Sequence, residues 1–212
     1  MLPFQKNDWR KPVTQNVSPL KQRIIEGMKQ ALKFWSLLIF IRLMGLAGDR
    51  HESRTAKLAR DLCLQCKLPR EMTTKIYRGA MLHDIGKIAI SQNILISPHP
   101  LTEASMAIVR THPIISERIL RALGFDIVIL RIARHHHSRF DGSGYPDKLS
   151  GMNIPIGARI LAVVDSYDAM TNARVYKPTM TKDEALDELE RGAGVLYDPY
   201  IVEKFIGLMN DN

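Results

Sequence analysis

Residues 71–87 read EMTTKIYRGAMLHDIGK. In this stretch a helical pattern is followed by side chains that can bind a metal ion. Its first part predicts a helix over about 71–84. At the end of that helix, His83 and Asp84 place an imidazole beside a carboxylate, and both groups are ligands for Mn, Fe or Zn. Lys87 adds an ammonium group close by. The stretch therefore predicts a helix that presents a metal site.

The arrangement of His83 and Asp84 suggests more than one metal ion. Adjacent residues on a helix project about 100° apart, so this pair can grip two ions beside one helix, with the carboxylate as a bridge. A two-metal site holds its ions roughly 3.5–4 Å apart, lowers the pKa of a shared water and clamps a phosphoryl displacement. Further candidate ligands stand at wide separations: His51, His112, His136, His137 and Asp165. This inventory suits a multinuclear site that hydrolyses a phosphoester.

Each candidate also has a simpler interpretation. A lone histidine is more often a packed residue than a ligand, but three consecutive imidazoles at 135–137 have no obvious packing purpose. His99, between two prolines, is expected to be exposed. Asp165 follows an apolar run and would be costly to bury alone, so either a metal ion or a salt bridge must satisfy it. Asp168, one turn later, is expected to orient a ligand or a water from behind.

The rest of the chain predicts helices and no strands. Apolar residues between Leu20 and Leu46 recur at intervals of three and four, which predicts a helix that is apolar almost all round at its C-terminal end. Irregular segments are expected at 1–18 and 88–96, because proline and polar residues punctuate them. Further helices are expected at about 50–66, 102–111, 113–123, 126–136, 155–171, 181–191 and 198–209. The fold class is therefore all-α.

Composition limits the functional classes. The 212 residues suit one domain, or one domain with an extension. A net charge of +8 fits a merely basic surface or attraction to a polyanion such as a nucleotide. DNA is not an expected partner, because no recognition-helix motif or basic cluster stands out.

The expected compartment is the cytoplasm. No secretory signal is visible, and the apolar stretch 34–46 is too short and too interrupted to span a membrane. Cys63 and Cys66 stand in a C-x-x-C spacing without the further thiols or histidines that a structural zinc site needs. Two ordinary cysteines in a reducing compartment are favoured over a redox motif.

An ordered series of motifs resembles the HD-GYP domain, a branch of the HD phosphohydrolase superfamily that hydrolyses the bacterial second messenger cyclic di-GMP. The resemblance runs from about Gly48 to the C-terminus. It rests on His51-x-x-Arg54, Leu82-His83-Asp84-Ile85-Gly86-Lys87, Thr111-His112-Pro113, His136-His137, Asp141-Gly142-Ser143-Gly144-Tyr145-Pro146, Ile154-Pro155, Arg159-Ile160-Leu161-Ala162, Asp165-Ser166-Tyr167-Asp168-Ala169-Met170-Thr171 and Arg174-x-Tyr176. It implies an HD-domain helical bundle over 48–212, with a short N-terminal helical extension over 1–47.

The resemblance also implies roles for individual residues. Two divalent metal ions would be held by a set of seven side chains in which Asp84 is the bridge: His51, His83, Asp84, His112, His136, His137 and Asp165. Fe or Mn is the expected metal, and Zn shares the same ligands. Asp84, Lys87 and Asp168 form the expected catalytic group, in which Lys87 contacts a substrate phosphate and assists the leaving group. Arg174 and Lys177 would grip the phosphates, although a solvated face is the simpler interpretation of both. Tyr145 would shape the lip of the site, and His135 is expected to lie outside the ligand set.

Three positions depart from the family pattern. Ala47 stands where some members carry a glutamate for an additional metal, which implies a binuclear site and linear pGpG as the main product. Ser138 stands where glutamate is common, which alters the support behind the histidine pair. Ser97 replaces a common lysine and thins the positive surface near the site.

Two other functions stay open on the sequence. One is a catalytically weak receptor for a cyclic dinucleotide, in which the N-terminal helix forms a dimer or partner surface and the signature loop recruits a diguanylate cyclase. The other is a hydrolase of a different cyclic dinucleotide. The complete set of ligands favours the phosphodiesterase, because a scaffold does not require seven of them.

Overall fold

The computed structural model describes residues 18–43, 51–172 and 179–211, with side chains described from 18 to 39 in the first segment. Within these residues the chain forms ten α-helices and two short 3-10 helices, and no strand. In chain order they are α1 (Pro19–Leu43), α2 (His51–Gln65), α3 (Arg70–Leu82), η1 (Ile85–Ala89), α4 (Gln92–Leu95), α5 (Glu103–Val109), α6 (His112–Ala122), α7 (Ile127–His135), η2 (Gly151–Asn153), α8 (Ile156–Thr171), α9 (Lys182–Arg191) and α10 (Pro199–Asn210). The predicted all-α class is confirmed.

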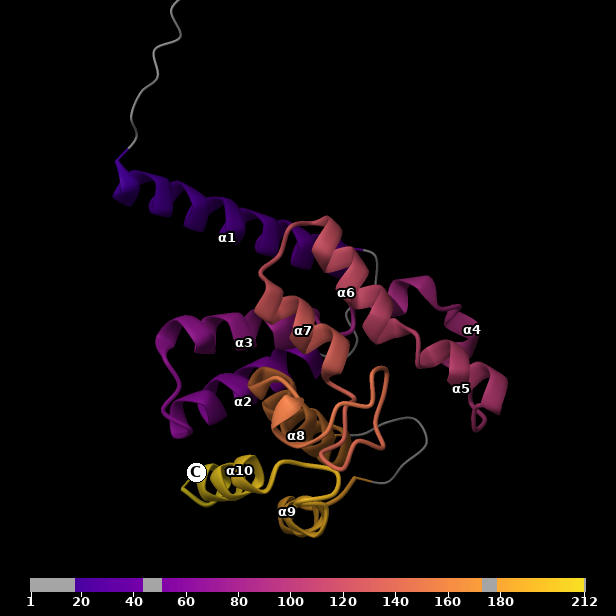
Figure 1. Ribbon diagram of the computed structural model, residues 1–212. Helices are drawn as coiled ribbons and strands as arrows, with labels where there is room; N and C mark the ends of the chain where they lie inside the picture. The colour runs from indigo at the N-terminus through magenta and orange to yellow at the C-terminus, as the bar shows by residue number, and fades with distance from the viewer. Residues whose placement is uncertain (1–17, 44–50, 173–178, 212) are drawn as a thin grey trace, which may run out of the picture.

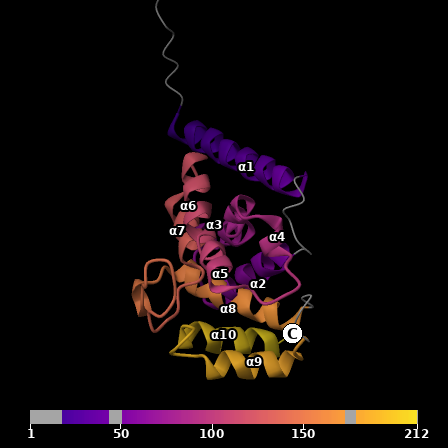
Figure 2. The ribbon, with the colours of Figure 1, turned by 90° about the vertical axis from the view of Figure 1, so that its right-hand side faces the viewer.

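The helices stack in three tiers, which two perpendicular views show (Figures 1 and 2). The helix α1 crosses the top, a central group contains α2, α3, α6, α7 and α8, and α9 and α10 close the bottom. The short helices α4 and α5 project to one side (Figure 1). None of the described helices combines the length and the apolar character that crossing a bilayer requires.

Two apolar clusters hold these tiers together. The larger cluster joins α2, α3, α7, α8, α9 and α10 through fully buried side chains such as Leu62, Ile132 and Phe205. The smaller cluster joins α1 to the central group, because Phe34 packs with residues of α3, η1, α6 and α7. Burial of one large apolar side chain contributes about 1.5–3 kcal/mol, so both clusters fix the helices that carry the polar site between them.

Side-chain caps fix where several helices begin. Thr181 and Glu184 form a reciprocal capping box at α9, as their spacing predicts. The carboxylate of Asp126 accepts a hydrogen bond from the Val128 amide, and that of Asp198 accepts one from Tyr200. Asp198 also pairs with the buried Arg159, which ties α10 to α8.

Two boundary predictions were wrong. The helix expected over 71–84 ends at Leu82, and the Asp84 backbone has already left the helical conformation, with φ −96° and ψ 6°. A tight contact accounts for this turn: a Cβ on Gly86 would lie 2.2 Å from the carbonyl oxygen of His112. The chain must leave the helix to bring Gly86 against α6. The segment 88–96, expected to be irregular, instead contains the end of η1 and the whole of α4.

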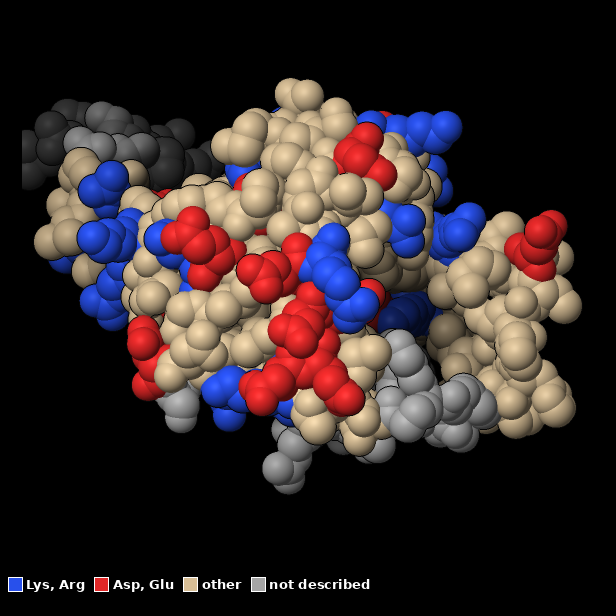
Figure 3. Space-filling view, turned by 90° about the horizontal axis from the view of Figure 1, so that it is seen from below, with Lys and Arg blue, Asp and Glu red and all other residues tan. Residues whose placement is uncertain are grey.

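The charge of +8 does not form a continuous basic surface on the face seen from below (Figure 3). Acidic side chains gather in the middle of this face, where α9 lies. A recess separates the lobe of α4 and α5 from the rest of this face, and a basic side chain lies inside it (Figure 3).

Candidate metal centre

The predicted ligands converge where several helices meet. His51 opens α2, His112 opens α6, and His136 and His137 directly follow α7. His83 and Asp84 follow α3, and Asp165 projects from the middle of α8. Rigid helices therefore hold ligands that lie far apart in the sequence, and most of these ligands sit at helix ends.

The ligands divide into two groups, which we name the carboxylate half and the histidine half. The carboxylate half contains His51, His83, Asp84 and Asp165; donor atoms of the first three lie within 4.8 Å of one another. The histidine half contains His112, His136 and His137, whose donor atoms also lie within 4.8 Å of one another. Each half contains a group of side chains that could hold a metal ion.

Asp84 contacts both halves. Its Oδ2 lies 3.3 Å from Nε2 of His83, and its Oδ1 lies 3.1 Å from Nε2 of His112 and 3.8 Å from Nε2 of His136. A carboxylate in this position can hold a metal ion with each oxygen, which is the bridging role that the sequence implies.

The protonation of the histidines provides a test of whether a metal fits. The Nδ1 atoms of His83, His112 and His136 lie 2.7–2.8 Å from the carbonyl oxygens of residues three positions earlier. Each Nδ1 therefore carries a proton and donates it to a carbonyl, so Nε2 is the nitrogen that points into the site and binds a metal ion when the ring is neutral. The Nε2 atoms of His112 and His136 are only 3.1 Å apart, so two electron pairs face each other. A cation resolves this repulsion.

The carboxylates give the same result. The Oδ1 atoms of Asp84 and Asp165 are buried and make no hydrogen bond. Histidine nitrogens lie close to both: Nε2 of His51 is 3.0 Å from Oδ1 of Asp165, and Nε2 of His112 is 3.1 Å from Oδ1 of Asp84. Buried acceptors without donors cost free energy unless an ion satisfies them. The residues present fit divalent metal ions, and all seven predicted ligands lie in the centre.

The pKa values differ between the two halves. Burial alone would lower the pKa of His51, but the facing carboxylates of Asp165 and Asp168 raise it to about 9. Burial alone would raise the pKa of Asp84, but the charges of His83 and Lys87 hold it well below its usual range. In the histidine half, burial and the neighbouring imidazoles lower the pKa of His136 well below its usual range and that of His137 to about 4.

Asp168 lies behind His51, as predicted. Its Oδ2 is 2.6 Å from Nδ1 of His51, and Nε of Arg54 donates to its Oδ1 at 2.6 Å. Asn172 donates to the same oxygen at 3.1 Å. Such carboxylate–histidine pairs orient a ligand and make it a stronger base. The sequence did not identify Arg54 and Asn172 as site residues. For Arg54 a signal existed, because the spacing His51-x-x-Arg54 places the side chains of His51 and Arg54 on one face of the helix.

Lys87 and Tyr145 lie at the edge of the centre. The Lys87 ammonium pairs with Oδ2 of Asp84 and keeps 40% of its side chain exposed, so part of it stays available to a substrate. The Tyr145 ring stacks on His137, with ring centroids 4.9 Å apart and 27° between the planes. The Arg110 guanidinium lies 5.6 Å from the centroid of the Tyr145 ring. No sequence signal pointed to Arg110.

The signature loop is held close to the histidine pair. The Tyr145 amide donates to the His137 carbonyl at 3.2 Å. A Cβ on Gly144 would lie 2.5 Å from that same carbonyl, so the loop reaches the pair only with glycine at this position. Tyr145 therefore shapes the site through contact with a ligand side chain.

The remaining predicted residues fall outside the ligand set or outside the described residues. His135 is buried beside Asp147, 3.7 Å away, and His99 is exposed, as expected. Ser138 is buried and its hydroxyl makes no hydrogen bond. Three positions lie outside the described residues: Ala47, Arg174 and Lys177.

Comparison with known protein families identifies the family of this chain. The family model described as HD domain matches residues 38–201. The chain belongs to the HD domain family. This HD domain is 41% identical over 161 residues to a cyclic di-GMP phosphodiesterase of Thermotoga maritima, covering 75% of this chain and 44% of the relative. It is 44% identical over 144 residues to a cyclic di-GMP phosphodiesterase response regulator of Xanthomonas campestris, covering 67% of this chain and 38% of the relative.

Other relatives of the HD domain are named for a different cyclic dinucleotide. A 3'3'-cGAMP-specific phosphodiesterase of Vibrio cholerae is 33% identical over 138 residues, which cover 65% of this chain and 32% of the relative. The chain spans less than half the length of these curated relatives. The expected resemblance to HD-GYP domains is confirmed by the family model and by these relatives.

Solved structures support the fold of the HD domain. An HDG"Y"P protein from Bdellovibrio bacteriovorus superposes with a TM-score of 0.63 at 18% identity, covering 76% of this chain and 51% of the other. A cyclic GMP-AMP specific phosphodiesterase of V. cholerae gives a TM-score of 0.59 at 18% identity, covering 76% of this chain and 44% of the other. At this identity the likeness bears on the fold alone.

Proposed function

We propose that this HD domain is a metal-dependent phosphodiesterase that hydrolyses cyclic di-GMP mainly to linear pGpG. The observation that carries the proposal is the seven-ligand centre, in which Asp84 contacts both a carboxylate half and a histidine half. The names of relatives that are 41% and 44% identical support the choice of substrate. Residues 48–212 would form the phosphohydrolase domain, and residues 1–47 would form an extension.

The ligands suit two divalent ions, with Fe or Mn favoured over Zn. His51, His83, Asp84 and Asp165 would hold one ion, and His112, His136, His137 and the second oxygen of Asp84 would hold the other. When bound, such ions supply a water of lowered pKa and offset charge on a phosphoryl group.

The side chains around the centre have separate tasks in this proposal. Lys87, half exposed beside Asp84, contacts a phosphate oxygen and stabilises the leaving group. Asp168 keeps the His51 ring oriented through its 2.6 Å contact. Tyr145 forms one wall of the site, and Arg174 and Lys177 bind the remaining phosphate charge, as the family resemblance implies.

The direct test is anaerobic incubation of Fe(II)- or Mn(II)-loaded protein with cyclic di-GMP. Products are separated by chromatography, and the metal content is measured on the same sample. Conversion to pGpG with about two ions per chain is the expected result. Binding without turnover at full metal content would contradict the proposal and favour a receptor.

A second substrate class deserves a parallel assay, because a relative at 33% identity is named for 3'3'-cGAMP. Faster hydrolysis of 3'3'-cGAMP than of cyclic di-GMP would keep the reaction type and change the substrate. For partners, we propose a homodimer through the N-terminal helix, with a diguanylate cyclase as a candidate partner of the signature loop. The cytoplasm is the proposed compartment, since Cys63 and Cys66 are both free thiols.

A further inference from the structure

The helix α1 has two apolar faces, and its own domain covers one of them. Phe34 is buried in the smaller apolar cluster, and Leu37 and Leu38 pack against the same cluster. The opposite face carries five large apolar side chains that are 44–65% exposed: Ile25, Met28, Leu32, Trp35 and Ile39. At 100° per residue, these five centre roughly 140° away from Phe34 around the helix.

The spacing of the exposed residues is specific. Their positions advance by three, four, three and four, which is the heptad pattern of a coiled-coil seam. Ile25, Leu32 and Ile39 take the first apolar position of the heptad, and Met28 and Trp35 take the second. The five lie within roughly 80° of the helix circumference, and the exposed Ile24 widens this stripe to roughly 100°.

The first half of α1 also lacks support from its own domain. Every residue from 18 to 29 is exposed, so this half gains nothing from tertiary packing. It extends beyond the central helices in the view of Figure 1. A helical segment of roughly three turns is marginal in water without a packing partner, because nucleation is costly.

We propose that α1 is a dimerisation helix, which pairs with α1 of a second copy of this chain through the seam of Ile25, Met28, Leu32, Trp35 and Ile39. Heptad spacing favours a second copy, because an identical helix presents the same seam and its side chains interdigitate. Within a parallel pair the flanking Lys29 would face Ile24 of the partner helix rather than another cation. The seam therefore pairs without like-charge contact along its length.

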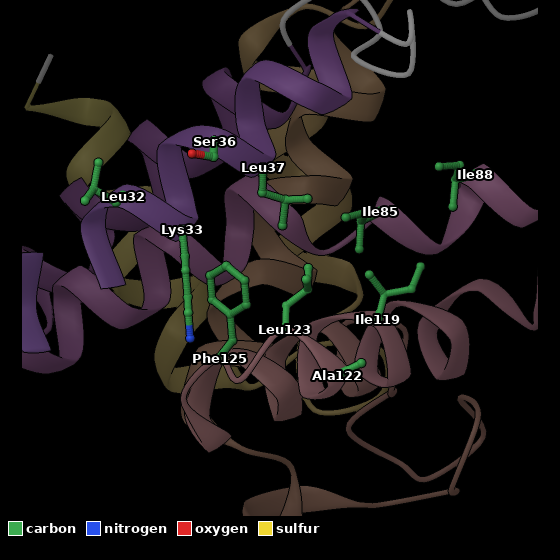
Figure 4. Close-up of a pocket in the computed structure, with 10 residues that line it drawn as sticks. All are labelled: Leu32, Lys33, Ser36, Leu37, Ile85, Ile88, Ile119, Ala122, Leu123 and Phe125. Carbon is green, nitrogen blue, oxygen red and sulfur yellow. The ribbon is translucent and has the colours of Figure 1, made fainter. Parts of the chain in front are cut away.

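An apolar groove enlarges the surface that a second copy can cover. The groove encloses about 760 Å³ between α1, η1 and α6, and Figure 4 shows Leu32 and Leu37 on one side of it and Ile119 and Leu123 on the other. Leu32 belongs to both the seam and the groove, so the two apolar surfaces are continuous. The inference concerns assembly and stands whether or not cyclic di-GMP is the substrate.

The test compares two leucines of similar exposure in the full chain. Leu32 on α1 is 65% exposed, and Leu64 on α2 is 60% exposed. Sedimentation equilibrium should give twice the chain mass of 24.1 kDa for the wild type and for Leu64→Glu. The variant Leu32→Glu should give the mass of one chain and keep its metal content. Its helical circular dichroism should fall by no more than the unpaired first half of α1 contributes. Trp35→Glu should behave like Leu32→Glu, because both place a charge in the seam.

Three outcomes would overturn the proposal. The wild type could sediment as one chain at every concentration tested, or Leu32→Glu could remain a dimer as Leu64→Glu does. In the third outcome, monomeric wild type binds vesicles of anionic lipid and Leu32→Glu does not, which would assign the seam to a membrane surface. Hydrolysis of cyclic di-GMP is measured on the same samples, so failure of the dimer is distinguishable from failure of the enzyme.

Discussion

In the carboxylate half of the metal centre, imidazole nitrogens face carboxylates, whereas in the histidine half they face one another. Nε2 of His51 lies 3.0 Å from Asp165, while Nε2 of His112 lies 3.1 Å from Nε2 of His136. This difference in neighbours changes the pKa values: the pKa of His51 is raised to about 9, and the pKa of His137 is lowered to about 4. The imidazole side chains of the two halves therefore differ in protonation near neutral pH. One half must exchange a proton for the metal ion, and the other already offers neutral ligands.

The change with the largest expected effect removes what the two halves share. Asp84→Asn keeps the shape of the side chain but weakens a ligand that contacts both groups. We expect less than about one metal ion per chain and a loss of turnover beyond the roughly 10–100-fold typical of outer-shell changes. Metal analysis and product chromatography on one sample measure both. Asp187→Asn, on the exposed face of α9, is the matched control. Unchanged metal content in Asp84→Asn would remove Asp84 from the ligand set.

The next change separates the halves. His51→Ala and His137→Ala each delete one ligand from one half only. Each variant should keep about one of the two ions expected for the wild type, because the other half retains its ligands. Metal content after dialysis gives the answer. Loss of both ions in either variant would mean that the halves act as a single site.

Replacing Asp168, which lies behind His51, should have a smaller effect on metal binding, and this effect should be confined to the carboxylate half. Asp168→Asn keeps a contact to His51 but loses the charge that Arg54 also binds. Metal affinity of that half should fall by roughly 10–100-fold, and full occupancy should return at high metal concentration. Titration with Mn(II) measures the affinity. Asp61→Asn, which removes an ion pair with Arg60 elsewhere on α2, should leave the affinity unchanged.

The smallest effect is on the stability of chelator-treated protein. The raised pKa of His51 stabilises the fold fully below about pH 6.5, and this contribution is lost as the pH rises to about 9. The lowered pKa of His137 has the opposite effect, because its contribution is present above about pH 6.5 and lost as the pH falls to about 4. The free energy of unfolding should therefore be greatest near pH 6.5.

Denaturant unfolding between pH 4 and 9.5 tests this expectation, with a loss on the order of 1–3 kcal/mol on each side. His51→Ala should flatten the alkaline side of the profile, and His137→Ala should flatten the acid side. If the alkaline side is the same in His51→Ala as in the wild type, the two halves do not differ in charge as described.

Helix periodicity and capping patterns predicted the longer helices, since apolar spacing and polar caps are local properties, but they missed η1 and α4. The chain direction at Asp84 was not predictable, because it depends on the contact of Gly86 with the His112 carbonyl in another helix. The seven ligands were predicted from the motif series that resembles a known family. Arg54 was missed because its role depends on Asp168, which stands more than 100 residues away in the sequence. Asn172 was missed although it stands only four residues after Asp168.

The sequence by itself determined the all-α class and the heptad spacing on α1, because both depend on residue type and local interval. It also supplied the candidate ligands, through the motifs that resemble a known family. Only the tertiary structure decided that the ligands fall into two halves, that Asp84 contacts both, and that one apolar face of α1 is covered while the other is exposed. Burial and charge pairing depend on which helices meet, and interval along the chain does not encode those distances. The same imidazole side chain therefore has a pKa of about 9 at His51 and about 4 at His137.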